Sequence, residues 1–351
     1  MPMLQHAICT GWQGCSIVAT NLLDQIADNQ LSEKRPDHFN WLEDFTVSTA
    51  EAERFADPDW IVPGLIVQGH LHIIAAEPNG GKTTVFFHLA GCMVEAGFNV
   101  IYVNADISAG DAKLMVKQAE QTGVKLLLPE MKAGKSMDDI VKNLITLNDS
   151  GTDLSGYVFI FDTLKKMTDV INKSASKRLL KLLRSMTAKS ATVICLAHTN
   201  KYSGHDGKPI YEGTGDIRSD VDNLIYLIPE KRPDGSMLVS AIPDKQRAAL
   251  EKITFEISPQ RKVKRLDEYH DIAGEKKRFT ERERDQDIIE HISAAIQAKK
   301  IKQCDIVSFC KDVGISRNQT LGCLKRYEKG NDCLWKATAG FEKNAKFYGL
   351  V

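Results

Sequence analysis

Short apolar runs alternate with helical periods through the middle of the chain. Helical spacing of apolar residues predicts helices at 82–97 and 174–190. Strands that alternate with helices indicate βαβ crossovers, so we expect an α/β fold with a mostly parallel sheet. The last three apolar runs follow one another without helices, and RPDG at 232–235 is a turn sequence, which predicts an antiparallel extension. The predicted strands are 71–76, 99–105, 156–162, 191–198, 223–229, 237–244 and 252–258.

The last part of the chain has a different pattern. Its apolar spacing predicts three short helices, followed by two strands around a turn at 340–344. The predicted helices are 280–297, 302–314 and 316–330. Capping-box sequences begin two of them, at Thr280 with Glu283 and at Ser316 with Gln319. Three helices and a hairpin, in this order, predict a small α+β winged-helix domain.

These patterns predict four parts. A segment with one predicted helix and an acidic connector covers 1–58, and the α/β domain covers 59–258. A charged linker at 259–279 then leads to the winged-helix domain at 280–351.

Composition is that of an ordinary globular protein. The chain has 351 residues, of which 43% are hydrophobic and 26% charged. No apolar run reaches the roughly 18 residues of a membrane span. The first residues lack the basic start of a signal peptide. Eight cysteines occur without CxxC pairs, so we expect reduced thiols and a cytoplasmic protein.

Charge is unevenly distributed although the formal net charge is +0. Acidic side chains outnumber basic ones in residues 1–60, and the reverse holds for residues 261–351. A basic surface at the C-terminal end would attract a polyanion, although it is also compatible with an ordinary solvated surface.

The stretch AAEPNGGKTT at 75–84 predicts a phosphate-binding loop between a strand and a helix. It fits the P-loop pattern, with Ala76 where glycine is usual. Glycines let the backbone turn its N–H groups inward, and the following helix directs its positive end at the same point. We expect the loop to hold ATP, with the lysine on the β- and γ-phosphates and the first threonine on Mg²⁺. The expected nucleotide-binding residues are Glu77, Pro78, Asn79, Gly80, Gly81, Lys82, Thr83 and Thr84.

Two aspartates are candidates for the remaining chemistry of an ATPase. Asp162 ends an apolar strand, where its carboxylate would hold Mg²⁺ together with Thr83; the alternative is a helix N-cap. Asp106 follows the preceding strand and is the candidate base for the attacking water. Its alternative role is the N-cap of a helix near 108–115.

The segments 59–84, 100–106, 157–164 and 193–201 together resemble the RecA-like ATPase core. More narrowly, they are similar to the hexameric replicative helicases of the RepA and DnaB kind, found on plasmids and phages. The resemblance covers about residues 59–258. Relatives usually carry glutamate at the place of Asp106, and the shorter aspartate predicts slower or water-mediated hydrolysis.

The resemblance also implies roles for residues at later strand ends. His198 matches the place of a polar γ-phosphate sensor, although a strand-end histidine is often structural. Lys245 and Arg247 match a K-x-R pair that reaches the ATP site of a neighbouring subunit. That role requires a homo-oligomer, and the alternative is two exposed charges on a hairpin.

DNA is the implied partner. Loops after the third and fourth core strands line a central pore in relatives and grip single-stranded DNA, which suits flexible loops with a few cations. The residues expected to do so are Lys165, Lys166, Lys201, Lys208 and Arg218.

The tail predicts a second DNA contact. The third helix of a winged-helix domain enters the major groove of duplex DNA. Arg317, Asn318 and Gln319 are of the types that read base edges, and Lys325 and Arg326 would contact phosphates. A domain used only for protein contacts or as a lid is the alternative.

The sequence therefore predicts a Mg²⁺-dependent ATPase that forms a ring and acts as a DNA helicase or translocase in the replication of a mobile element. Two alternatives remain at this stage. One is an ATP-binding, recombinase-type strand-binding protein, and the other is a DNA-binding regulator switched by ATP.

Overall fold

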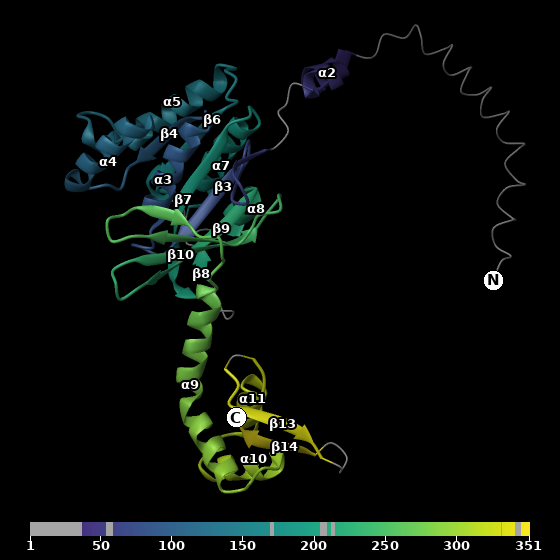
Figure 1. Ribbon diagram of the computed structural model, residues 1–351. Coiled ribbons are helices and arrows are strands. Elements are labelled where there is room, and N and C mark those ends of the chain that lie inside the picture. Colours follow the sequence, from purple (N-terminus) through teal and green to yellow (C-terminus); the bar gives the residue numbers. More distant parts are fainter. Residues whose placement is uncertain are drawn as a thin grey trace, which may run out of the picture. The chain divides into compact units, whose positions relative to one another are not determined.

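The structure is a computed structural model (Figure 1). It describes residues 37–53, 59–168, 172–203, 209–211, 215–330, 332–340 and 345–351. The chain divides into two compact units, Met1–Ala56 and Asp57–Val351. In the first unit the described elements are a 3-10 helix, η1 (Asp37–Phe45), and the short helix α2 (Thr49–Ala52), which begins with a capping box at Ser48. The helix predicted from the first residues of the chain lies outside the described residues.

The second unit is built on a mostly parallel sheet, so the expected α/β fold is confirmed. Strand β3 lies between β7 and β9 and is parallel to both. Strands β6, β4 and β5 continue the parallel part beyond β7. The bounds are β3 (Leu71–Ala76), β4 (Asn99–Asn104), β5 (Lys125–Leu127), β6 (Tyr157–Asp162), β7 (Thr192–Ser203) and β9 (Asn223–Lys231).

The predicted antiparallel extension is also confirmed. Strands β10 (Met237–Lys245), β11 (Ile253–Ile257) and β12 (Val263–Arg265) follow β9 in antiparallel order. The turn at 232–235 joins β9 to β10, and Gly235 there has φ of 83°, a conformation that glycine adopts without steric cost.

Helices cover both faces of the sheet (Figure 1). On β3, Ile74 and Ala76 pack with α3 and α4, whereas Leu71 and Ile73 pack with α5 and α7 on the opposite face. Strand β3 is therefore buried on both faces, which explains its continuous apolar sequence. The helix bounds are α3 (Lys82–Glu95), α4 (Ala109–Thr122), η2 (Pro129–Met131), α5 (Met137–Asp149), α6 (Leu164–Met167), α7 (Lys173–Thr187) and α8 (Gly215–Asp220).

Two short hairpins complete this part of the chain. Strand β1 (Trp60–Val62) pairs with β2 (Ile66–Val67), and β8 (Pro209–Tyr211) pairs with β7. These strands of two or three residues are too short to give a recognisable alternation in the sequence.

The C-terminal part has the expected order of three helices and a hairpin. Its core includes Trp335, whose indole Nε1 donates a hydrogen bond of 2.8 Å to the carbonyl of Leu324. The capping box of Ser316 with Gln319 is confirmed at the start of the third helix. The bounds are α9 (Ile272–Gln297), α10 (Gln303–Asp312), α11 (Arg317–Arg326), β13 (Trp335–Ala339) and β14 (Lys346–Leu350).

The expected charged linker at 259–279 differs from the structure. Strand β12 and the first turns of α9 occupy it, and Asp271 is the N-cap of α9. The helix start predicted at Thr280 is therefore wrong; its hydroxyl donates to the carbonyl of Lys276 within the helix. An edge strand and an exposed helical turn are both rich in charge, so composition alone does not separate them from a linker.

Within the part of the chain that the structure describes, each helix is too short or too polar to cross a bilayer.

Candidate functional site

The loop between β3 and α3 has the backbone that a P-loop requires. Gly81 is the N-cap of α3 with φ of 79°. A Cβ on Gly81 would lie 2.8 Å from Cδ1 of Ile257, and one on Gly80 would lie 2.9 Å from the carbonyl oxygen of Glu77. Gly80 is therefore required by a close backbone contact and Gly81 by its left-handed backbone, and side chains of β10 and β11 form a wall against the loop.

The lysine of this loop is enclosed. Lys82 is 6% exposed, and its Nζ lies 3.4 Å from Nδ1 of His198, a residue level with Ala76 on the neighbouring strand. Burial lowers the pKa of Lys82, while the nearby carboxylates of Asp162 and Asp106 oppose that shift. An ammonium group held in a closed, partly acidic site is suited to the terminal phosphates of a nucleotide.

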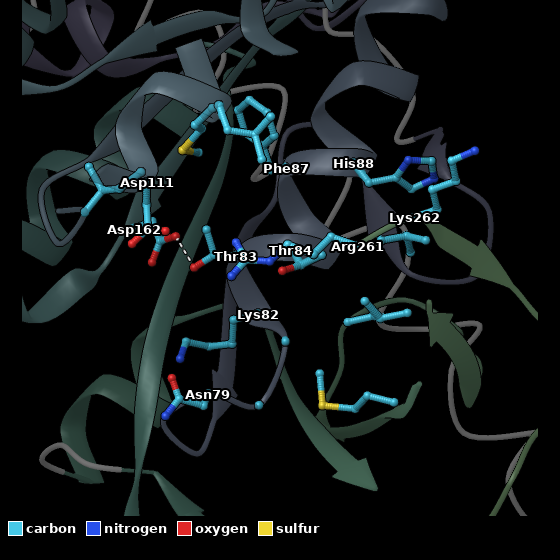
Figure 2. A pocket seen from close by; sticks show the side chains of 18 of the residues that line it. Asn79, Lys82, Thr83, Thr84, Phe87, His88, Asp111, Asp162, Arg261 and Lys262 are labelled. Atoms are coloured by element: carbon cyan, nitrogen blue, oxygen red, sulfur yellow. Dashed lines mark hydrogen bonds between the residues drawn. The ribbon is translucent and has the colours of Figure 1, made fainter. Parts of the chain in front are cut away.

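Asp162 lies at the centre of the site. Its Oδ2 accepts a hydrogen bond of 2.7 Å from the hydroxyl of Thr83 (Figure 2) and one of 2.9 Å from the hydroxyl of Tyr102. Burial raises the pKa of Asp162, and the bonds from Thr83 and Tyr102 partly offset that effect. The N-caps of α6 and α7 are Thr163 and Asn172, so the alternative role of Asp162 as an N-cap does not apply.

This pair of oxygen groups fits Mg²⁺. The cation prefers carboxylate and hydroxyl oxygens, and it keeps several water ligands in nucleotide sites. Thr83 and Asp162 are already in contact, so no rearrangement of the backbone is needed to present both oxygens to one ion.

Asp106 lies beside the loop and keeps its side chain half exposed. Its backbone N–H donates to Oδ1 of Asn104 at 3.0 Å, which fixes the turn after β4. The N-cap of α4 is Ser108, so the alternative role of Asp106 as that cap does not apply. One carboxylate oxygen of Asp106 lies 3.3 Å from Nζ of Lys166.

One cavity of about 1110 Å³ joins these groups. The P-loop from Pro78 to Thr84 lines it together with Asp106, Asp162 and His198. Glu77, which was expected to bind nucleotide, does not line the cavity; its carbonyl accepts the N–H of Gly80 and shapes the loop. The cavity extends along α4 on one side and past the turns of the antiparallel extension on the other.

Several lining residues were not predicted. Arg232, Arg261 and Lys262 contribute cations from the two turns, and Arg261 lies close to Thr84 in Figure 2. Arg261 has φ of 61°, a left-handed conformation that disfavours side chains other than glycine, asparagine and aspartate. Tyr102, which holds Asp162, was missed as well, although a tyrosine within an otherwise apolar strand is a signal for a buried hydrogen bond.

Lys245 and Arg247 lie outside this cavity. Lys245 is level with Leu224 at the start of β9, whereas Met237, at the other end of β10, contacts the P-loop side. Leu224 is in turn level with Ile73 of β3, three residues before the end of β3 that leads into the P-loop, and neither Lys245 nor Arg247 lines the cavity. Neither side chain is therefore placed at the nucleotide site of its own chain.

Both side chains have contacts at that far end. Arg247 forms an ion pair of 2.8 Å with the buried Asp222, which also binds Arg184 at 2.5 Å. Lys245 donates to the carbonyls of Arg218 and Ser219.

The predicted DNA contacts are dispersed over the surface. Lys165 and Lys166 lie on α6, and Arg218 forms an ion pair of 3.0 Å with Asp244. The side chain of Lys201 and the whole of Lys208 lie outside the described residues.

On α11, two of the side chains predicted to contact DNA already bind other groups of the protein. Arg317, Asn318 and Lys325 are exposed. The side chain of Gln319 closes the capping box with Ser316, and Arg326 forms an ion pair with the buried Asp285. Arg326 therefore stabilises the C-terminal core, in addition to any contact with phosphate.

Comparison with known proteins gives one family match. Residues 35–204, slightly less than half of the chain, match the family described as an AAA domain. Together with the geometry of the loop, this match supports a P-loop ATPase domain. No curated protein matches the chain.

Solved structures with a similar fold include the flagellar accessory protein FlaH from Methanocaldococcus jannaschii, at 18% identity, covering 59% of this chain and 93% of that chain with a TM-score of 0.43. The RadB recombinase is similar at 17% identity, covering 57% of this chain and 93% of that chain with a TM-score of 0.42.

Proposed function

We propose that the protein is a Mg²⁺-dependent ATPase that forms a ring and moves along single-stranded DNA, as a helicase or translocase of the RepA-like kind in mobile-element replication. The observation that carries the proposal is the single cavity in which Lys82, Asp162 and Asp106 meet at the carboxyl ends of three parallel strands. These are the groups that phosphoryl transfer to water needs.

The proposed chemistry assigns one task to each group. The P-loop N–H groups and Lys82 bind the phosphates, and Mg²⁺ held by Thr83 and Asp162 would neutralise their charge. Asp106 accepts a proton from the water that attacks the γ-phosphorus. Tyr102 fixes the orientation of the Asp162 carboxylate from behind.

Placing the phosphates at the P-loop also sets the orientation of ATP in the cavity. With the terminal phosphates at Lys82, the remainder of ATP extends past Thr84 toward the turn at 258–262 (Figure 2). We propose that Arg261 contacts the nucleotide there.

Replacing Arg261 with glycine tests this contact. Glycine adopts a φ of 61° without strain, so the turn should keep its shape and its stability. We expect affinity for ATP to fall by about tenfold, the contribution of one hydrogen bond to a charged group. Titration with a fluorescent ATP analogue measures the change. Lys264→Ala, which removes an exposed lysine outside the cavity, is the control; equal affinities in both variants would exclude the contact.

The position of Lys245 and Arg247 supports action between copies. Neither side chain lines the cavity beside its own P-loop, and both are held by contacts near the start of β9, so a role at a nucleotide would require a second chain. Head-to-tail contacts of this kind generate rings or filaments. We propose a hexameric ring in the cytoplasm.

The proposed DNA contacts have two sources. The segments after β6 and β7 would follow single-stranded DNA through the ring, with contacts from Lys165, Lys166, Lys201, Lys208 and Arg218. The C-terminal domain would use the exposed Arg317, Asn318 and Lys325 of α11 on duplex DNA, with Gln319 and Arg326 at its edges.

Three measurements on the purified full-length chain test the proposal. We expect ATP turnover to increase with oligothymidylate, a forked duplex to be unwound, and ring-shaped particles to form with an ATP analogue and single-stranded DNA. Stimulated turnover with filaments and no unwinding would instead identify a recombinase-type strand-binding protein. Nucleotide-dependent assembly on duplex DNA without turnover would identify an ATP-switched regulator.

A further inference from the structure

The ion pair between Lys166 and Asp106 connects two residues with different expected tasks. Asp106 is the candidate base for the attacking water, and Lys166 belongs to a candidate DNA-contacting segment. The Nζ of Lys166 lies 3.3 Å from Oδ1 of Asp106, and the two side chains are 48% and 47% exposed. The ammonium group of a candidate DNA-contacting residue is therefore paired with a carboxylate oxygen of the candidate base.

The fold brings these residues together through the register of two neighbouring strands. Strands β4 and β6 are parallel, and Asn104 is aligned with Asp162. Asp106 lies two residues beyond this aligned pair in the turn after β4, and Lys166 lies four residues beyond it on α6, the helix that follows β6. The backbone supports the arrangement, since the N–H of Ala105 donates to the carbonyl of Asp162 at 2.9 Å.

Helix α6, which carries Lys166, has one buried face and one exposed face. Leu164 and Met167 are buried in the core under α6, whereas Lys165 and Lys166 are exposed between them. Lys166 can therefore exchange partners by a rotation of its side chain, without disturbing the buried anchors.

We propose that the Lys166–Asp106 ion pair is a latch that keeps ATP hydrolysis slow until single-stranded DNA is bound. This inference rests on the proposed ATPase function. A DNA phosphate binds Lys166 and removes the ammonium group from Asp106. The freed carboxylate then accepts a proton from the attacking water, while the bond between the β–γ bridging oxygen and the γ-phosphorus breaks to give ADP and phosphate.

The strength of the contact suits a latch. Half-exposed ion pairs are weak, because water and salt screen them, so one phosphate can compete for the lysine. DNA binds only the state in which Lys166 is released, and this difference in affinity between the two states is what shifts the equilibrium. Lys166 is accordingly a positioning residue that acts through Asp106.

The test compares steady-state ATP turnover of full-length proteins with and without oligothymidylate. We expect Lys166→Ala to raise the DNA-free kcat about two- to five-fold with little change in KM, which corresponds to roughly 0.4–1 kcal/mol. For this variant, the ratio of kcat with oligothymidylate to kcat without it should fall toward one. Lys166→Arg should restore part of the low basal rate, because it can still pair with Asp106; a loss of local structure would not be repaired in this way. Lys166→Gln, which also lacks the charge, should repeat the result of the alanine variant.

The control is Lys181→Ala, which removes an exposed lysine on α7 and should leave both rates unchanged. The latch is excluded if Lys166→Ala and Lys166→Gln have the wild-type DNA-free rate or a lower one while DNA still stimulates them. A wild-type protein without turnover under either condition would contradict the ATPase function itself, so the two failures are distinguishable.

Discussion

Replacing Lys82 with alanine is expected to abolish ATP turnover. The ammonium group is buried in the cavity beside His198, and no other lysine or arginine of the described P-loop segment can take its place. Loss of one preorganised group that stabilises the transition state costs about 10²–10³-fold in kcat. Because the same lysine binds the ground-state phosphates, affinity for ATP should fall as well. Phosphate release and binding of a fluorescent ATP analogue measure the two effects.

Two measurements separate a chemical from a structural effect of Lys82→Ala. The thermal transition should stay within a few degrees of the wild type, and duplex DNA binding without nucleotide should be unchanged, because α11 belongs to a different hydrophobic core. Turnover within tenfold of the wild type would mean that the loop around Lys82 does not hold a hydrolysed nucleotide.

Mixing Arg247→Ala with Lys82→Ala subunits is expected to recover activity that neither variant has alone. An arginine supplied by a neighbour typically contributes about 10³-fold or more to phosphoryl transfer. A Lys82→Ala subunit still carries Arg247, so it can complete the intact P-loop of an Arg247→Ala neighbour. In a random equal mixture, roughly a quarter of the head-to-tail interfaces would combine the two intact parts. Turnover measured over a series of mixing ratios should pass through a maximum.

Arg184→Ala is the control for this experiment. Arg184 and Arg247 both bind Asp222, so either variant leaves one arginine on that buried carboxylate. Arg184→Ala should lower the thermal transition but keep turnover, because it removes only a contact within the chain. If Arg184→Ala and Arg247→Ala lose turnover equally, and no mixture recovers it, the role of Arg247 lies within its own chain.

The sequence was most informative where strands are buried on both faces. Runs such as 71–76 and 157–162 contain almost only apolar residues, so their positions follow directly from the pattern. The P-loop was visible for a related reason, since its glycines and lysine have no role in a core strand. The predicted cluster of Lys82, Asp106, Asp162 and His198 around one cavity followed from strand ends meeting at one edge.

The remaining features depend on contacts between segments far apart in the chain. The local sequence around Arg261 does not indicate that its turn lies against the P-loop. That proximity depends on the order of β10 and β11 in the sheet. The pairing of Lys166 with Asp106 depends on the register of β4 and β6, which no local pattern gives. The start of α9 was missed because its first residue, Ile272, is buried but residues 275–280 are exposed and mostly charged, so these turns lack an apolar stripe.

Strand β10 has contacts of different kinds at its two ends. Met237 and Val239 face Gly81 of the P-loop, and Lys245 marks the end from which Arg247 would reach an adjacent subunit. Strand β11 pairs with β10 from Met237 to Ala241, and β9 pairs with it as far as Lys245, with a register shift before Lys245. In a ring, a small shift of the loop on binding or losing nucleotide would move the opposite end as well. Strand β10 would then connect the nucleotide site of one subunit to the position of Arg247 at its neighbour.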